Sequence, residues 1–368
     1  VFADQAFVGL SGNGSLVLSP PAGGQVLVDG VAFTSLVERL QAVEQQLEKQ
    51  RCRTVADTTT IAGLSGIAKW RGGVLAGNGN IYGTPLDADS VLNPNTNVAD
   101  TTTITGLENG GGKWLGGALA DNGKIYCLPY NSGAVLIIDP TTNSADTTAI
   151  TGLDGECCKW TGAVLADNGM LYGIPFVSQS VLIVNPNTNT TDVITGLSGS
   201  GKWWGGMLAG NGKIYGIPYM SNSVLIIDPM TNTVDTTTIT GLDSGGSKWI
   251  GGALAGNGKI YGIPHDAGSV LVIDPETNTA DTAAITGLTE RDKWWGGVLA
   301  SNGKIYGIPY DSQSVLVINP NDNTTDMIAA LSGSAKWTGG VLANNGKVFG
   351  IPRDTASVLI IKRDCEGL

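Results

Sequence analysis

A unit of about 45 residues recurs seven times in this chain, and the pair Lys-Trp marks every copy. Successive Lys-Trp pairs are separated by 44, 46, 43, 46, 45 and 43 residues. The seven lysines are Lys69, Lys113, Lys159, Lys202, Lys248, Lys293 and Lys336. A period of about 40–50 residues is typical of propeller blades. The chain is therefore expected to build a closed ring of similar units.

Each copy holds four short segments rich in β-branched and aromatic residues, of the types WGGVLA, KIYGIP, SVLVID and DTTTITGL. Turn residues bound each segment, so each is predicted to be a strand. Asn-Gly joins the first two, as a type I′ hairpin turn with two positive φ angles requires. A Pro-Thr-Asn stretch joins the last two. The prediction is an all-β, seven-bladed β-propeller of four-stranded blades over residues 53–368.

The order of the segments predicts how the ring closes. A first DTTT-type segment, residues 57–64, precedes the first Lys-Trp pair, and the last copy ends without one. The N-terminal strand is therefore expected to complete the seventh blade, which leaves no sheet edge free.

Two cysteines support this closure. Aligning the last copy with the second puts Cys365 and Cys52 in one hairpin from opposite sides, which predicts a Cys52–Cys365 disulfide. Such a long closed loop would add roughly 5 kcal/mol in the chain-entropy model. Two unrelated free thiols are the alternative. Of the remaining cysteines, Cys157 or Cys158 could bridge to Cys127 and leave one thiol for intermolecular pairing.

The consensus GGVLAGNGKIYGIPYNSNSVLIIDPxTNTxDTTTITGL resembles the YVTN-type repeats of surface-layer propellers. The resemblance covers residues 53–368 and implies the propeller fold without indicating an activity. This chain departs from that pattern by Gly-Ile-Pro in place of a Val-Thr-Asn segment and by its fixed Lys-Trp. Similar Trp-Gly-Gly and Tyr-Gly-Ile-Pro repeats are expected in extracellular proteins of algae and other protists.

Residues 1–52 differ in kind from the repeats. Residues 1–32 alternate like short strands, and residues 33–52 are predicted to form a coiled-coil oligomerisation helix. Its apolar seam is Phe33, Leu36, Leu40, Val43 and Leu47. An isolated helix of this length is marginal, so it needs a partner. A homo-oligomer, with a trimer favoured, is the expectation; a helix docked on its own propeller and a higher-order fibre are the alternatives.

Charge and composition exclude several classes of protein. The chain carries 21 basic and 32 acidic residues, which argues against nucleic acid or an anionic membrane as a partner. No apolar run approaches the roughly 20 residues that span a bilayer. A chain that begins at Val1 is consistent with a processed, secreted protein, so an extracellular or cell-surface location is expected.

Catalytic chemistry finds little support in the sequence. The lone histidine, His265, stands in a slot that holds tyrosine in other copies, and is interpreted as a surface substitution. No phosphate-binding loop and no Cys or His cluster for zinc is present. Seven arginines are scattered without repeat register. We expect no enzymatic activity, no cofactor and no metal.

Aromatic residues recur on one expected face of the ring, where the loops before the first strand and after the second meet. Rings that stack on a sugar beside polar groups suit a lectin. The candidate ligand-binding residues are Tyr130, Phe176, Tyr219, His265, Tyr310, Trp204 and Trp295. The tryptophans of the Lys-Trp pairs have an alternative structural role as wedges between blades, beside glycines that let the inner strands crowd the axis.

The seven repeat lysines are expected to form a basic ring near the channel mouth. The ring could hold an anion or an acidic segment, or the lysines could pair with nearby carboxylates and carbonyls, which is favoured. At the opposite end of the blades, repeat aspartates are expected to close Asx turns, with a cation as the weaker option. These are Asp57, Asp100, Asp146, Asp192, Asp235, Asp281 and Asp326.

Three Asn-x-Ser/Thr sequons, at Asn13, Asn189 and Asn323, would allow N-glycosylation. The last two fall in the same hairpin of different blades, on the face opposite the aromatic residues.

Two functions remain open. The first is a non-enzymatic extracellular adhesion or recognition protein, a multivalent lectin-like propeller on an oligomerising stalk, with glycans or other surface proteins as partners. The second is a structural subunit of a cell-surface layer, filament or appendage that binds no glycan.

Overall fold

The computed structural model describes residues 7–10, 16–19, 27–28, 31–32, 35, 37–40, 52–93, 98–108, 110–153, 155–329 and 331–365. The chain divides into two compact units. One comprises residues 1–54 and 363–368, and the other comprises residues 55–362.

The first unit contains two small antiparallel pairs. Strand β1 (Phe7–Leu10) pairs with β2 (Leu16–Ser19), and β3 (Leu27–Val28) pairs with β4 (Val31–Ala32).

Within the predicted coiled-coil helix, residues 33–52, the described residues show no coiled coil. Only Ser35 and residues 37–40 are described as helical, and Leu40 is 59% exposed. A coiled coil needs a second helix to bury its apolar seam, and a single chain supplies none. Of the other predicted seam residues, Phe33, Leu36, Val43 and Leu47 lie outside the description of side chains.

In the second unit, each copy of the repeat gives a meander of antiparallel strands, and the first strand begins at the repeat tryptophan. Glycines lie inside this strand, Asn-Gly follows it in the hairpin, and β-branched residues are frequent in the strands that follow. The first strands are β6 (Trp70–Leu75), β8 (Trp114–Leu119), β12 (Trp160–Leu165), β16 (Trp203–Leu208), β20 (Trp249–Leu254), β24 (Trp294–Leu299) and β28 (Trp337–Leu342). The second strands are β7 (Ile81–Pro85), β9 (Ile125–Pro129), β13 (Leu171–Pro175), β17 (Ile214–Pro218), β21 (Ile260–Pro264), β25 (Ile305–Pro309) and β29 (Val348–Pro352).

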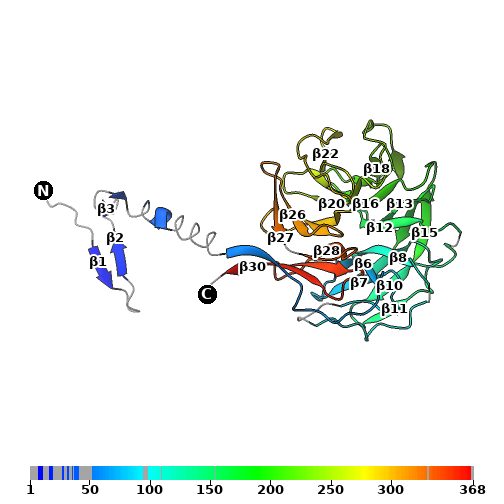
Figure 1. The fold of residues 1–368 in the computed structure, drawn as a ribbon, viewed down its shortest axis with the longest axis horizontal. Helices are drawn as coiled ribbons and strands as arrows, with labels where there is room; N and C mark the ends of the chain where they lie inside the picture. The colour runs from blue at the N-terminus through cyan, green and yellow to red at the C-terminus, as the bar shows by residue number, and fades with distance from the viewer. Residues whose placement is uncertain are drawn as a thin grey trace. The chain divides into compact units, whose positions relative to one another are not determined.

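The third and fourth strands lie further from the axis, so that first-strand labels gather near the centre of Figure 1 and fourth-strand labels near its rim. The third strands are β10 (Leu136–Asp139), β14 (Val181–Asn185), β18 (Leu225–Asp228), β22 (Leu271–Asp274), β26 (Ser314–Asn319) and β30 (Leu359–Cys365). The fourth strands are β11 (Ser144–Asp146), β15 (Thr190–Ile194), β19 (Thr233–Asp235), β23 (Thr279–Asp281), β27 (Thr324–Ala329) and β5 (Cys52–Asp57).

The described residues form six four-stranded blades, not the seven that were predicted. The first copy contributes the two-stranded sheet β6–β7, extended only by isolated bridges from Gly83 to Leu92 and from Asn93 to Asp100. The reason lies in the sequence: residues 90–94 read SVLNP where the second copy reads AVLIIDP. The segment is two residues shorter, so it cannot form a full ladder beside β7.

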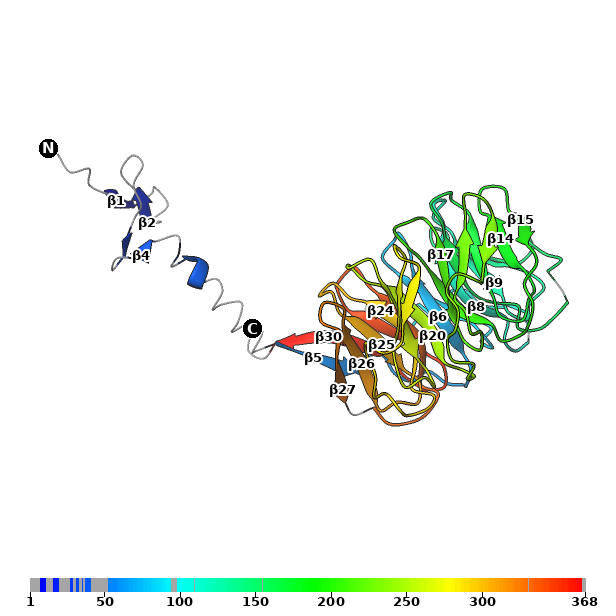
Figure 2. The ribbon, with the colours of Figure 1, turned by 90° about the horizontal axis from the view of Figure 1, so that it is seen from above.

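The N-terminal strand closes the ring as predicted. The last blade has the strand order β28-β29-β30-β5, and β5 and β30 lie side by side in Figures 1 and 2. Lys362 of β30 pairs with Asp57 of β5 at 2.9 Å. Strand β5 begins at Cys52 and β30 ends at Cys365, but both side chains lie outside the description, so the disulfide stays a prediction.

The position of the fourth strands corrects the sequence interpretation. Residues 57–64 do not form the closing strand, because β5 ends at Asp57. Asp235 likewise ends β19, and its carboxylate accepts the backbone N–H of Thr237 at 2.6 Å and of Thr238 at 3.2 Å. The Asp-Thr-Thr sequence thus turns the chain instead of extending the ladder. The same turn follows Asp57, Asp100, Asp146 and Asp281.

Glycine explains how the first strands approach one another at the axis. The glycine two residues after each repeat tryptophan has a positive φ, between 62° and 140°. A Cβ built on each one would lie 3.1 to 3.8 Å from the Cα of the next. The contacts return to their start and define a glycine ring, Gly72, Gly116, Gly162, Gly205, Gly251, Gly296 and Gly339. Side chains are therefore excluded from this layer.

Tyrosines tie neighbouring blades together near the rim. The hydroxyl of Tyr215 on β17 donates to Asn278 Oδ1 at 2.7 Å and accepts from Asn211 at 3.0 Å. Asn278 belongs to the outer hairpin of the next blade. Equivalent bonds join Tyr82 to Asn143, Tyr126 to Asn189, Tyr172 to Asn232 and Tyr261 to Asn323. The buried phenol thus serves as a latch between blades.

Candidate functional site

The loops that precede the first strands bring the repeat lysines into the protein interior. All seven lysine side chains are buried. Lys202 Nζ donates to the carbonyls of Ser178 and Gly199 at 2.9 Å and of Phe176 at 3.0 Å. The other six lysines bond to loop carbonyls in the same way. The lysines therefore hold the loops in place through hydrogen bonds, and they do not form a solvent-exposed basic ring.

The repeat tryptophans are buried as well. Each indole N–H donates to the carbonyl of the residue twenty positions later, at 2.7 to 2.9 Å. These seven rings pack in the cores between blades, so their indoles are not part of an accessible surface.

A different set of aromatic residues meets at the axis. Trp204 and Trp295 directly follow a repeat tryptophan, and the others directly follow the proline that ends a second strand. We call this set the axial aromatic cluster: Tyr130, Phe176, Trp204, Tyr219, His265, Trp295 and Tyr310. These are the seven residues predicted to bind ligand, and the structure brings all of them together.

The rings of the axial aromatic cluster pack against one another. Neighbouring centroids lie 4.9 Å apart for Phe176 and Trp204, 5.1 Å for Trp204 and Trp295, and 4.9 Å for Trp295 and Tyr310. Such separations are those of favourable edge-to-face and tilted aromatic pairs. The cluster forms one continuous aromatic floor, and it does not form separate pockets on separate blades.

Exposure differs within the cluster. Trp204 and His265 are 6% and 3% exposed, whereas Tyr130, Phe176, Tyr219, Trp295 and Tyr310 are half-buried. The interpretation of His265 as a surface substitution is therefore wrong. Its ring stacks edge-on against Trp295, with centroids 5.2 Å apart.

Two arginines lie at this floor, although sequence reasoning set the arginines aside as scattered. The Arg71 guanidinium carbon lies 4.4 Å from the Trp295 ring centroid and 5.6 Å from that of Trp204. Arg353 lies over Tyr310 at 5.7 Å. Arg71 occupies the slot of Trp204 in the first copy, and Arg353 the slot of Tyr310 in the last. Ring closure places these two copies next to each other. The two arginines are therefore neighbours in space although they are far apart in the sequence.

Beneath the floor, the axis holds a cavity of about 210 Å³. Glycines of the first strands line its wall, and Arg71, Thr161, Trp204 and Trp295 also line it. The glycine ring thus leaves an open space at the axis, with the Arg71 side chain facing it.

His265 also lies between two carboxylates. Its Nδ1 is 3.4 Å from Asp266 and its Nε2 is 3.5 Å from Asp292, and neither nitrogen has a hydrogen-bond partner in the described structure. Burial lowers the pKa of His265, while the two carboxylates oppose this shift. The three residues could be considered as metal ligands. We assign no metal, because the carboxylates face different ring nitrogens and one ion bonds to only one of them.

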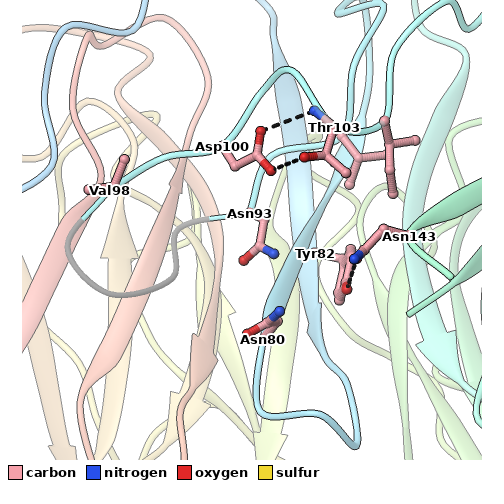
Figure 3. Close-up of a pocket in the computed structure, with 9 residues that line it drawn as sticks. Asn80, Tyr82, Asn93, Val98, Asp100, Thr103 and Asn143 are labelled. Carbon is pink, nitrogen blue, oxygen red and sulfur yellow. Dashed lines mark hydrogen bonds between the residues drawn. The ribbon is translucent and has the colours of Figure 1, made fainter. Parts of the chain in front are cut away.

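A second pocket of about 340 Å³ opens where the first copy lacks a full third strand (Figure 3). Asp100 bonds to Thr103 on one side and Tyr82 donates to Asn143 on the other. Residues 94–97, which connect Asn93 to Val98 beside this pocket, lie outside the described part of the chain. We therefore assign it no function.

The remaining predicted sites are dispersed. Cys127 is buried in a core, and burial raises the pKa of its thiol to about 12. Cys157 and Cys158 lie in a loop and are described as free thiols, so no bridge to Cys127 is formed. Asn189 and Asn323 are exposed in outer hairpins, and Asn13 lies outside the described residues.

Comparison with known proteins identifies the fold alone. No family model and no curated protein matches the sequence. A streptogramin B lyase structure aligns with a TM-score of 0.67 and 11% identity, over 86% of this chain and 99% of that chain. The extracellular domain of the one-component system BT4673 from B. thetaiotaomicron gives 0.63 and 9%, over 83% and 39%. The WD40 propeller of Doa1 gives 0.62 and 12%, over 84% and 97%.

These similarities support a β-propeller repeat fold. They do not show a surface-layer family, an adhesion role or a catalytic activity. Among the described residues, no helix has the length and apolar character needed to cross a membrane.

Proposed function

We propose that this chain is a non-enzymatic recognition protein that binds a saccharide on the axial aromatic cluster. The observation that carries the proposal is the pattern of variation among the copies. Every copy keeps the lysine, the tryptophan and the ring glycine, which build the fold. The residue after the tryptophan is Arg71, Leu115, Thr161, Trp204, Ile250, Trp295 and Thr338 in successive copies.

This variation falls at the axis, where Arg71 and Trp295 are half-buried and the other five residues of the slot are buried. The slot after the second-strand proline varies too, from Leu86 in the first copy to Arg353 in the last. A scaffold that needed only ring closure could repeat one residue in each slot. Different residues around one axis make the half-buried part of this cluster asymmetric, and an asymmetric site suits one ligand in one orientation.

The chemistry of the floor favours a sugar. Half-buried tyrosine and tryptophan rings offer flat apolar area with polar edges, which can stack on a pyranose ring. Because the rings form one floor, each propeller offers one site, in place of the several sites expected from the repeats. Multivalency would then require several chains, which we propose residues 1–52 supply in an extracellular homo-oligomer.

A structural subunit of a surface layer or filament is the second candidate. The observation in its favour is that residues 1–54 form a compact unit with residues 363–368, distinct from the propeller. Such a unit suits assembly between chains, and assembly needs no ligand at the axis.

A glycan array separates the two. We would screen the full chain, Trp295→Ala at the half-buried floor, and Met230→Ala as a control, since Met230 is exposed in an outer hairpin. Recognition predicts binding by the wild type and Met230→Ala that is lost in Trp295→Ala. An array on which the wild type binds nothing, while the chain assembles in solution, would favour the structural subunit.

A further inference from the structure

Arg71 is a half-buried cation for which the described residues form no salt bridge, although the charge of Asp87 attracts it. Its Nε atom is buried and has no hydrogen-bond partner. Its neighbours are the rings of Trp295 and Trp204, which attract the guanidinium through their π faces but offer no hydrogen-bond acceptor. A buried donor without an acceptor costs free energy, so its retention needs an explanation.

Arg353 adds a second cation to the same place. It bonds to Asp354 at 2.7 Å, and its Nε is also buried without a partner. Burial, followed by the positive charge of Arg353, lowers the pKa of Arg71 to about 10. Arg71 therefore remains charged at neutral pH, and two like charges face the floor together.

This local charge is opposite to that of the whole chain, which carries a net charge of −11. General electrostatic attraction would bring cations to such a protein. An anion reaching Arg71 must instead be recognised locally. Guanidinium groups match planar carboxylates with two parallel hydrogen bonds, which an ammonium group cannot do.

We propose that Arg71, with Arg353 beside it, binds the carboxylate of an acidic saccharide whose ring rests on Trp295 and Tyr310. This inference rests on the proposed function and specifies its ligand as a uronic-acid-type sugar. The carboxylate supplies an acceptor to the Arg71 guanidinium, and it relieves the repulsion between the two guanidinium groups. The aromatic rings supply the apolar contact.

The test compares one sugar with and without its charge. Calorimetric titration of the full chain with an oligogalacturonate is set beside its methyl ester, which keeps the sugar backbone and masks the carboxylates. The variants are Arg71→Met, Arg71→Lys and the control Arg291→Met, which removes a charge from an exposed arginine in the loop before Lys293.

The wild type and Arg291→Met should bind the acid form tighter than the ester. Arg71→Met should lose roughly 10- to 100-fold in affinity for the acid form and little for the ester, since charge-assisted hydrogen bonds are of this size. Arg71→Lys should recover the charge without the bidentate geometry and fall between the two. Equal affinity for acid and ester would overturn the carboxylate site and leave saccharide recognition standing.

A second readout distinguishes failure of the two proposals. Sodium acetate, a carboxylate with no sugar ring, is added to chain labelled with ¹⁵N at tryptophan, and the indole resonance of Trp295 is followed in the wild type and in Arg71→Met. A shift that depends on Arg71, without binding of either oligosaccharide, would retain the carboxylate site and refute saccharide recognition at the floor. No shift and no binding would refute both.

Discussion

The glycine ring makes a sharp prediction about stability, and Gly251→Ala tests it. Gly251 has φ of 62°, and a Cβ there would lie 3.2 Å from the Cα of Gly296 in the next blade. A left-handed conformation costs an L-residue about 1–2 kcal/mol. Overpacking against backbone adds about 1–3 kcal/mol, because the neighbouring strand cannot rotate away as a side chain could. We expect a loss of about 2–5 kcal/mol.

Gly256→Ala is the matched control in the same blade. Gly256 lies in the hairpin after β20, no atom comes within 4 Å of its built Cβ, and its φ is not in the left-handed region. The same chemical change there should alter the free energy of unfolding by less than about 1 kcal/mol. Urea unfolding followed by tryptophan fluorescence measures both. With a slope near 3 kcal/mol/M, Gly251→Ala should lower the midpoint by roughly 1 M.

The reasoning fails if Gly251→Ala and Gly256→Ala unfold at the same urea concentration. That result would mean that the first strands tolerate side chains at the axis, and that the recurrence of glycine there has another cause.

Three further perturbations follow from single contacts. Tyr215→Phe removes the hydroxyl that bonds β17 to the next blade, and should lower the free energy of unfolding by about 1–2 kcal/mol in urea titrations. A variant as stable as the wild type would refute a stabilising role for this hydrogen bond. His265 is the chain's one histidine, and burial lowers its pKa below the value of the unfolded chain. The free energy of unfolding should therefore fall as pH decreases below 6.5, because the unfolded chain gains a proton there before the folded chain does. His265→Phe should flatten this fall between pH 6.5 and 5. The same pH dependence in the wild type and the variant would contradict this prediction. Ala335 holds φ of 49°, so Ala335→Gly should raise the urea midpoint by the equivalent of about 0.5–1 kcal/mol, and a lower midpoint would show that the loop is not strained there.

Much of the fold could be predicted because the turn residues, the glycines and the order of the strands can be read from the repeat sequence. Asn-Gly marks the first hairpin, but only its glycine has a positive φ, so the predicted type I′ turn, which needs two, is wrong. Gly-Gly after the repeat tryptophan marks the crowded axis. The separation of the N-terminal strand from its blade predicts closure through β5. Asn-Gly and the first glycine of Gly-Gly recur in every copy, and the separated N-terminal strand occurs once, so all three signals can be read from the linear sequence.

What could not be predicted lies where one copy departs from the others. The first copy lacks a full third strand because its segment SVLNP is two residues shorter than the segment of the second copy. Counting the copies of the repeat does not detect such a deletion. The Asp-Thr-Thr segments look like strands by composition, but side-chain hydrogen bonds to Asp235 and its equivalents turn the chain. Propensity alone does not decide between these outcomes.

The aromatic residues of the candidate site were predicted from the sequence, but their arrangement was not. Tyr130, Trp204 and Tyr310 were predicted because aromatic residues recur on one face of the ring, yet their rings meet on one floor instead of serving separate blades. Arg71 and Arg353 were missed because they belong to the first and last copies. Only the closed ring makes those copies neighbours.

The most direct test of the central claim, that ligands bind on the axial aromatic cluster, is a titration of ¹⁵N-tryptophan-labelled full chain with the strongest glycan from the array. The nine tryptophans provide an internal control. Seven indoles are bonded to carbonyls in the cores between blades, whereas Trp204 and Trp295 lie at the axis. We predict that the glycan shifts the indole resonance of Trp295 most, that of Trp204 next, and leaves the other seven in place. Shifts confined to the seven core indoles, or glycan binding that moves neither axial resonance, would contradict the account.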